Sequence, residues 1–174
     1  MLRVFNCSWN KITEIKNLPD TLQIFICSGN KITKIGKLPE LLQTFICSKN
    51  NISRIENLPK SLQIFIRSDN EITKIENLPD CLLNFHCSRN KIMKIENLPI
   101  SLHRFYCSEN KIEKIENLPE QLLEFYCRGN EISKIENLPK TLEYLWCDSY
   151  LIIENIPPSL KFLNNNDYVQ ETEN

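Results

Sequence analysis

Alanine is absent from this chain of 174 residues, and only three glycines and two histidines are present. With so few glycines, the chain has no glycine-rich loop of the kind that cradles phosphates. With two histidines, neither a histidine metal site nor a histidine-based catalytic pair is expected. No nucleophile with its base, and no pair of carboxylates, stands apart from the repeated pattern described below. The sequence therefore predicts a protein that is not an enzyme and that uses no cofactor or metal.

Two further absences concern charge and long hydrophobic runs. Lys and Arg number 21 and Asp and Glu number 22, so the formal net charge is −1. A nucleic-acid-binding domain needs a basic excess, so no nucleic-acid partner is expected. No run of about 18 apolar residues occurs, so no membrane partner is expected. The first residues enter the repeated pattern without a separate apolar segment, which predicts no signal peptide and a cytoplasmic location.

What the chain has instead is one 20-residue unit repeated along nearly its whole length. In one-letter code the unit is L-x-x-F-x-C-x-x-N-x-I-x-x-I-x-x-L-P-x-x. Seven copies are nearly regular, the eighth, from Leu142, degrades, and a truncated ninth begins at Ile156. We therefore predict one repeat domain over residues 1–163, with eight repeats and part of a ninth, and a polar tail over residues 164–174.

The first half of each unit is typical of a short β-strand. Residues 22–28 alternate in character and are rich in apolar and aromatic side chains. Because side chains alternate along a strand, Phe25 and Cys27 are expected to point inward and Ile24 and Ile26 outward. Stacked repeats would form a parallel sheet with one continuous core. The Leu-Pro step favours an extended return segment without a long helix, because the residue before proline avoids the helical region.

The cysteines follow the same period. Seven of the eight occupy one repeat position, only Cys81 lies elsewhere, and no C-x-x-C pair occurs. We expect reduced thiols stacked as small buried hydrophobes, with redox sensing or incidental metal binding as alternatives. Arg67 replaces cysteine in one repeat, and a cation there is costly unless it is paired or bent towards solvent. Asp69 and Glu71 are candidate partners, and a tolerated substitution is favoured over a functional irregularity.

Two other columns indicate structural roles. The asparagine that recurs from Asn10 to Asn130 is expected to hydrogen-bond the backbone of its own loop and the next loop. On the return segment, a basic column runs from Lys34 to Lys134 and an acidic column lies two residues further on. Side by side they can form exposed pairs worth about 0–1 kcal/mol each. Both signs are swapped in the first repeat, which supports the pairing.

These residues resemble leucine-rich repeats, with Phe and Cys at positions usually held by Leu. The return segment is similar to repeats of the protein phosphatase 1 regulatory subunit, whereas the 20-residue length and the Leu-Pro step are more similar to bacterial secreted effectors. Mixed repeats of this kind also occur in giant DNA viruses, which would place the chain in the host cytoplasm. The resemblance covers residues 2 to about 163. It implies a mostly β solenoid of the α/β repeat type: a right-handed arc with a parallel concave sheet and a helix-poor, extended or single-turn convex side. For function it implies protein binding through the concave sheet.

The outward strand positions vary, whereas packing fixes the inward ones, so a binding site is expected on the concave face. One outward column changes from aliphatic near Ile26 to aromatic at Trp146. Tyr, Trp and Arg dominate many interfaces, and contiguous exposed apolar surface is rarely left unused. The predicted partner-binding residues are Ile24, Ile26, Ile46, Ile64, Ile66, His86, Arg104, Tyr106, Tyr126, Tyr144 and Trp146.

The sequence thus predicts a non-enzymatic interaction module that binds a protein or peptide on its concave face. The alternative is a self-associating structural component, which would pair through this face or through the N-terminal end, where no cap precedes the first strand. A third interpretation is that the aromatic column only stabilises the sheet by stacking across strands.

Overall fold

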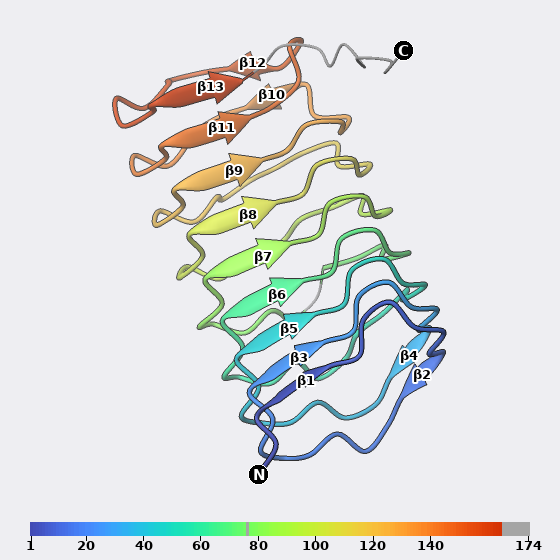
Figure 1. Cartoon of the computed structure of the whole chain (residues 1–174). Coiled ribbons are helices and arrows are strands. Elements are labelled where there is room, and N and C mark those ends of the chain that lie inside the picture. The colour runs from blue at the N-terminus through green and yellow to red at the C-terminus, as the bar shows by residue number, and fades with distance from the viewer. Residues whose placement is uncertain (76, 165–174) are drawn as a thin grey trace, which may run out of the picture.

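The computed structural model of the chain describes residues 1–75 and 77–164. Nine three-residue strands form one parallel sheet, one strand from each turn of a solenoid (Figure 1). No helix occurs in the described residues. In sheet order the strands are β1 (Val4–Asn6), β3 (Ile24–Ile26), β5 (Thr44–Ile46), β6 (Ile64–Ile66), β7 (Asn84–His86), β8 (Arg104–Tyr106), β9 (Glu124–Tyr126), β11 (Tyr144–Trp146) and β13 (Phe162–Asn164).

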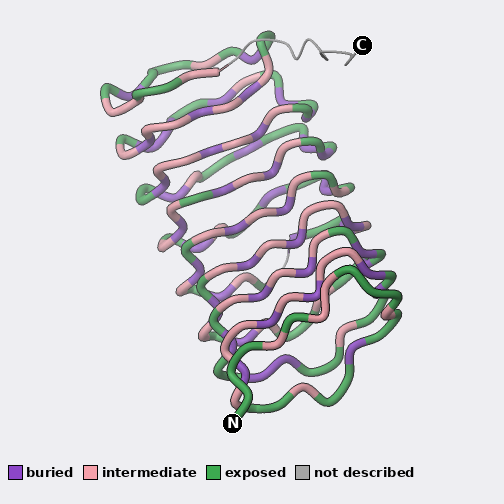
Figure 2. The backbone as a smooth tube through the Cα atoms, viewed as in Figure 1, coloured by how far each residue is buried: buried purple, intermediate pink, exposed green. Residues whose placement is uncertain are grey.

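The strands pair in register at the 20-residue period, so equivalent side chains stack in columns. Phe25 lies opposite Phe45, with Ile24 and Ile26 opposite the outward residues of β5. The predicted alternation is confirmed, because Phe25 and Cys27 are fully buried whereas Ile24 and Ile26 are half-buried. The same buried positions recur in successive turns (Figure 2). The chain therefore has one core running along the solenoid, as the sequence predicts.

The phenylalanine column forms the centre of this core. Successive rings from Phe5 to Phe125 have centroids 5.5–5.8 Å apart and lie within 12° of parallel, except for Phe65 and Phe85, whose rings are inclined by 27°. This separation falls in the range favoured for offset stacked rings, which adds to the gain from burying apolar area. Leu145 continues the column in β11 and is fully buried.

The return side of the solenoid is helix-poor, as predicted, but it also contains short strands that the sequence did not predict. β2 (Glu14–Ile15) pairs with β4 (Lys34–Ile35), and β10 (Lys134–Ile135) pairs with β12 (Ile152–Ile153). The expected ion pairs between the two charge columns are present, for example between Arg54 and Glu56, whose Nε and Oε1 lie 3.1 Å apart. The reversed pair of the first repeat, Lys16 with Glu14, is also formed.

A second asparagine column, which the sequence reasoning missed, shapes the return segment. Asn17, just before the Leu-Pro step, has a φ of 53°. Left-handed backbone of this kind is costly for most residues, but asparagine adopts it more readily than others. The equivalent residues share the conformation: Asn57, Asn77, Asn97, Asn117 and Asn137. This explains why Asn recurs two residues before proline in these repeats.

The first asparagine column forms a hydrogen-bonded ladder between repeats. The Asn50 Oδ1 accepts from the backbone N–H of Ile32 at 2.9 Å. Its Nδ2 donates to the carbonyls of Cys27 and Cys47 at 3.0 and 3.1 Å. The structural role is confirmed, but the expected direction is wrong, because the inter-repeat bonds run to the preceding repeat and not to the next. The turn of the solenoid places the preceding loop, not the following one, beside the amide.

Arg67 also differs from the sequence expectation. Its side chain neither bends into solvent, being 4% exposed, nor pairs with its predicted partners. Asp69 instead lies 3.8 Å from Arg89, and Glu71 pairs with Lys91. Those partners sit on the next repeat at the surface, where both members of a pair stay hydrated. Of the polar tail predicted over residues 164–174, all but the first residue lies outside the described part of the chain.

Candidate protein-interaction surface

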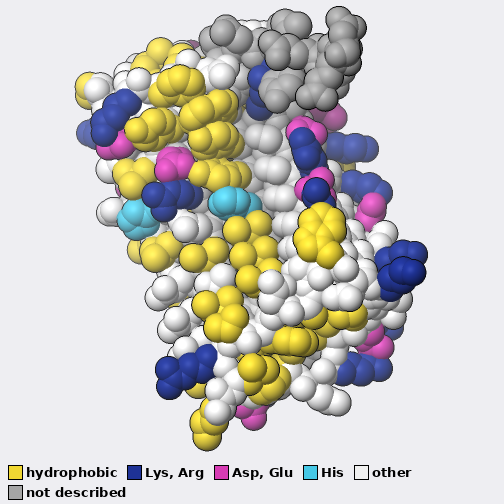
Figure 3. Space-filling view, in the orientation of Figure 1, with side chains coloured by type: hydrophobic (Ala, Val, Ile, Leu, Met, Phe, Trp, Pro, Cys, Tyr) yellow, Lys and Arg dark blue, Asp and Glu magenta, His cyan; other side chains and the backbone are white. Residues whose placement is uncertain are grey.

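The exposed face of the nine-stranded sheet, hereafter the sheet face, carries all the predicted partner-binding residues. Each strand contributes two outward side chains, and strand pairing aligns them in two columns. Arg104 is exposed, and the other ten predicted residues are half-buried. The sheet thus brings together, on one surface, side chains that span more than 120 residues of sequence. Apolar side chains gather over the strands on this face (Figure 3).

The aliphatic end of the sheet face lies on β3, β5 and β6. Ile26, Ile46 and Ile66 are adjacent in one column, and Ile24 and Ile64 flank Thr44 in the other. Their branched side chains suit the half-buried surface of a sheet, so part of this column is explained by sheet stability alone. No aromatic residue occupies an outward position of these three strands.

The aromatic end is a continuous row of ring side chains, hereafter the aromatic row. Its members come from five successive strands: His86, Tyr106, Tyr126, Trp146 and Phe162. Neighbouring centroids in the row lie 4.0, 4.2, 4.1 and 4.6 Å apart. The rings of Tyr126 and Trp146 are nearly parallel, at 10°. Such contacts hold the rings in place before any partner binds, which reduces the entropy lost on binding.

Phe162 is a member of the row that the sequence reasoning missed. It pairs with Tyr144 in the sheet register and is 42% exposed. The signal was available, because Leu160 and Leu163 occupy the Leu and Phe positions of a further repeat. That repeat starts 18 residues after Leu142 and not 20, so a strict 20-residue count puts Phe162 out of phase. In the structure the last turn is two residues shorter, which places Phe162 opposite Tyr144 at an outward position of β13.

A polar cluster fixes one edge of the row. The Arg104 Nε donates to the Glu124 Oε1 at 2.8 Å, and the Tyr106 hydroxyl donates to the other carboxylate oxygen. Burial raises the pKa of Glu124, but the hydrogen bonds from Tyr106 and Arg104 outweigh it and the net shift is downward. Glu124 therefore stays ionised and orients two of the predicted binding residues. Glu124 was not among the predicted site residues, although its place in the outward column beside Arg104 indicated it.

His86 forms the end of the row opposite Phe162, and its imidazole is held neutral. Burial lowers the pKa of His86 to about 4, with Glu124 opposing the shift and Arg104 adding to it. Its ring packs against Tyr106 at a centroid distance of 4.0 Å. A neutral imidazole at neutral pH behaves in this position as a flat, largely apolar contact surface.

Replacing His86 with Asn is expected to weaken the acid sensitivity of the fold. In the unfolded chain a histidine has a pKa of about 6.5. Below that pH the unfolded state binds a proton at His86, whereas His86 of the folded state stays unprotonated until the pH approaches 4. Folding stability is then lost as the pH falls from about 6.5 towards 4, the pKa of folded His86. Urea unfolding at pH 7 and pH 5 measures the loss. His103→Asn is the matched control, and equal pH dependence of wild type and His86→Asn would contradict this account.

The described residues also bear on metal binding, membrane insertion and cysteine chemistry. No group of three or more His, Cys, Asp or Glu side chains arranged to hold a metal ion exists within residues 1–75 and 77–164. Within the same part of the chain, no helix is long and apolar enough to cross a membrane. All eight cysteines are free thiols. Burial raises the pKa of Cys147 to about 11, with Asp148 adding to the shift. The buried column is therefore a ladder of neutral thiols.

Comparison with known proteins gives a consistent assignment of the fold. No protein-family model and no curated protein matches the sequence. Among solved structures, YopM from Yersinia enterocolitica WA-314 superposes with a TM-score of 0.90 and 29% identity over 95% of this chain. The chain spans 38% of that protein. The leucine-rich-repeat domain of a Shigella effector gives a TM-score of 0.77 and 23% identity, covering 86% of this chain and 70% of that one.

A third similar structure is the functional domain of InlJ from Listeria monocytogenes, which is described as including a cysteine ladder. It has a TM-score of 0.56 and 21% identity, covering 95% of this chain and 53% of that one. At this identity the likeness concerns the fold alone. All three structures superpose on most of this chain. The chain is a leucine-rich-repeat solenoid of mostly β structure, with repeats similar to those of bacterial effector proteins.

Proposed function

We propose that the chain is a non-enzymatic interaction module that binds a protein or peptide on its sheet face, with the aromatic row as the anchor. The observation that carries this proposal is the row itself. Five ring side chains stay partly exposed and in mutual contact, from His86 to Phe162. Aromatic side chains are the commonest hot-spot residues of interfaces, because each buries a large area at a small entropic cost.

The aliphatic residues Ile26, Ile46 and Ile66 extend the proposed site along the same column. An elongated partner segment could lie across the strands from the aliphatic to the aromatic end. Arg104 and Glu124 lie beside the row and offer a polar contact at its edge, where rim charges guide orientation more than affinity. The effector-like repeats support an interaction role, and we further propose that the chain acts in the cytoplasm of a host cell.

The test replaces Tyr126 and Trp146 with alanine together. A photo-cross-linking residue at position 84, which is outward-facing on β7 beside the row, first identifies the partner in an otherwise wild-type chain, and the purified partner is then titrated by calorimetry. Loss of two hot-spot rings is expected to raise the Kd at least 100-fold. Met93→Ala with Ile100→Ala is the matched control, because these apolar side chains are 61% and 82% exposed and lie outside the sheet strands.

Three results are informative in this experiment. An unchanged Kd in the double variant would reject the aromatic row as the anchor. Cross-links only between copies of this chain, with light scattering that shows a dimer, would favour the self-associating alternative. A monomer that forms no cross-link to any other chain would leave the row with a sheet-stabilising role and overturn the proposal.

A further inference from the structure

The most unusual side chain of the core is Arg67, which occupies the position held by cysteine in the other regular repeats. It is 4% exposed, and its Nε and Nη2 atoms are buried without a hydrogen-bond partner among the described residues. The guanidinium packs against two stacked rings of the core, with Cζ 5.2 Å from the centroid of Phe65 and 5.0 Å from that of Phe85. Ring faces attract the cation but supply neither hydrogen-bond acceptors nor a negative charge.

The cysteines on either side of Arg67 do not neutralise it. Cys47 and Cys87 flank the guanidinium in the ladder, and its positive charge favours their thiolate forms. Burial outweighs this effect and raises the pKa of each thiol to about 12. Both thus remain neutral thiols at physiological pH. An arginine remains charged in proteins, so the core carries a cation that no described residue compensates.

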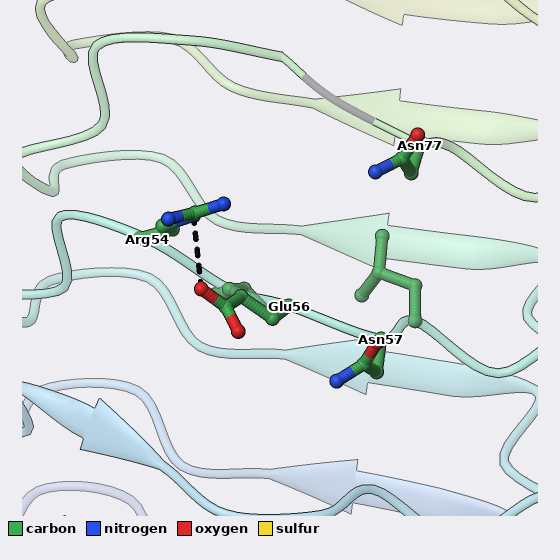
Figure 4. Close-up of a pocket in the computed structure, with 6 residues that line it drawn as sticks. Arg54, Glu56, Asn57 and Asn77 are labelled. Atoms are coloured by element: carbon green, nitrogen blue, oxygen red, sulfur yellow. Dashed lines mark ion pairs between the residues drawn. The ribbon is translucent and has the colours of Figure 1, made fainter.

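Arg67 reaches from the sheet side of the core to a hollow on the return side. The hollow measures about 370 Å³ and is lined by Ser53, Arg54, Ile55, Arg67, Thr73 and Lys74. Three of these side chains are cationic, two carry hydroxyl groups, and none of the described lining residues is acidic. Arg54 and Ile55 also line the neighbouring hollow, in which Arg54 points towards Glu56 (Figure 4). The ion pair between them lies in that neighbouring hollow, and none of the described residues that line the hollow around Arg67 carries a carboxylate.

We propose that this hollow binds a small oxyanion of the phosphate or sulfate class, with Arg67 as its principal ligand. The part of the Arg67 guanidinium that lines the hollow can donate a charge-assisted hydrogen bond to such an anion, and arginine is well suited to oxyanions of this class. The hydroxyls of Ser53 and Thr73 and the ammonium of Lys74 complete a set of donors drawn from two repeats. An anion in the hollow supplies the negative charge that the described core residues leave out, while Nε and Nη2 stay buried behind the part of Arg67 that lines the hollow. The site lies on the opposite side of the core from the proposed protein-binding surface.

Inorganic phosphate is the probe for the test, and thermal unfolding is the first readout. In a phosphate series at constant ionic strength, balanced with sodium chloride, the wild-type Tm is expected to rise by about 5 °C at 50 mM for a Kd of about 1 mM. Arg67→Cys restores the residue found in the neighbouring repeats, so it is expected to fold. Its Tm is expected to exceed that of wild type without phosphate and to stay constant in the series.

A second variant tests the location of the site. Ser53→Ala with Thr73→Ala keeps the arginine but removes two hydroxyl donors, and calorimetry is expected to show a phosphate Kd about 10-fold higher than in wild type. O-phospho-L-serine in place of phosphate distinguishes the source of the anion. A matching response shows that phosphoryl esters enter the hollow, and a response to inorganic phosphate alone shows a site for the free ion. An equal phosphate response in wild type and Arg67→Cys, or none in wild type, would overturn the proposal.

Discussion

Replacing Phe105 with alanine is expected to lower the free energy of unfolding by about 4 kcal/mol and the Tm by about 10 °C. Phe105 is fully buried, and its ring stacks between Phe85 and Phe125 with centroid distances of 5.8 and 5.7 Å. Truncation removes the largest fully buried side chain of its repeat and leaves a cavity that the neighbouring turns cannot fill, because their own rings are fixed by strand pairing. Chemical unfolding monitored by circular dichroism measures the loss.

Phe5→Ala is the matched control for this prediction. Phe5 is half-buried at the end of the same column and has one neighbouring ring, Phe25, at 5.7 Å. Its truncation is expected to cost only about 1–2 kcal/mol, since part of its area is already in water. A solenoid is stabilised by contacts between nearest repeats, so a break in the middle uncouples both halves. Equal losses for Phe105→Ala and Phe5→Ala would show that the phenylalanine column is not the continuous core described here.

Asn50→Ala is expected to cost about 3 kcal/mol. The main loss is the acceptor for the buried backbone N–H of Ile32, which Asn50 Oδ1 supplies at 2.9 Å. The carbonyls of Cys27 and Cys47 each lose one of two donors, because Asn30 and Asn70 also donate to them. These carbonyls therefore stay partly satisfied, and the buried N–H sets the size of the effect.

Asn10→Ala provides the comparison at the exposed end of the ladder. Asn10 donates only within its own loop, to the carbonyls of Cys7 and Ser8, and is exposed. Water can replace those bonds, so the expected loss is about 1 kcal/mol or less. Hydrogen exchange at the Ile32 amide provides a direct readout, since its protection should fall selectively in Asn50→Ala. Unchanged protection there would contradict the role assigned to the inter-repeat bond.

Much of the fold could be predicted from the sequence because the repeat imposes the same environment every 20 residues. The alternation of Phe25 and Cys27 with Ile24 and Ile26 was sufficient to separate core from surface. The Leu-Pro step was sufficient to exclude a long return helix. The direction of the inter-repeat hydrogen bonds in the asparagine ladder could not be predicted, because Asn50 can in principle reach either adjacent loop. Only the rise of the solenoid selects the preceding one.

The candidate surface was predicted less completely. The outward columns followed from alternation, but the contribution of Phe162 required the actual length of the last turn. The contact between Glu124 and Tyr106 links the two outward columns, and a period alone does not specify such diagonal contacts. The sequence thus predicts which residues face outward, but only the structure shows that their rings pack into one row.

The sequence by itself determined the period, the parallel sheet, the inward columns and the helix-free return side. Each of these features follows from local residue preferences that recur at the same position of every repeat. Only the tertiary structure decided what happens where the pattern breaks. Arg67 could bend outward or stay inside, and in the structure it stays inside, packed against the rings of Phe65 and Phe85 and beside a hollow lined by cationic side chains. The ninth repeat could continue the sheet or end it, and strand pairing with β11 adds Phe162 to the aromatic row. Both outcomes depend on contacts between different repeats, which no single repeat encodes.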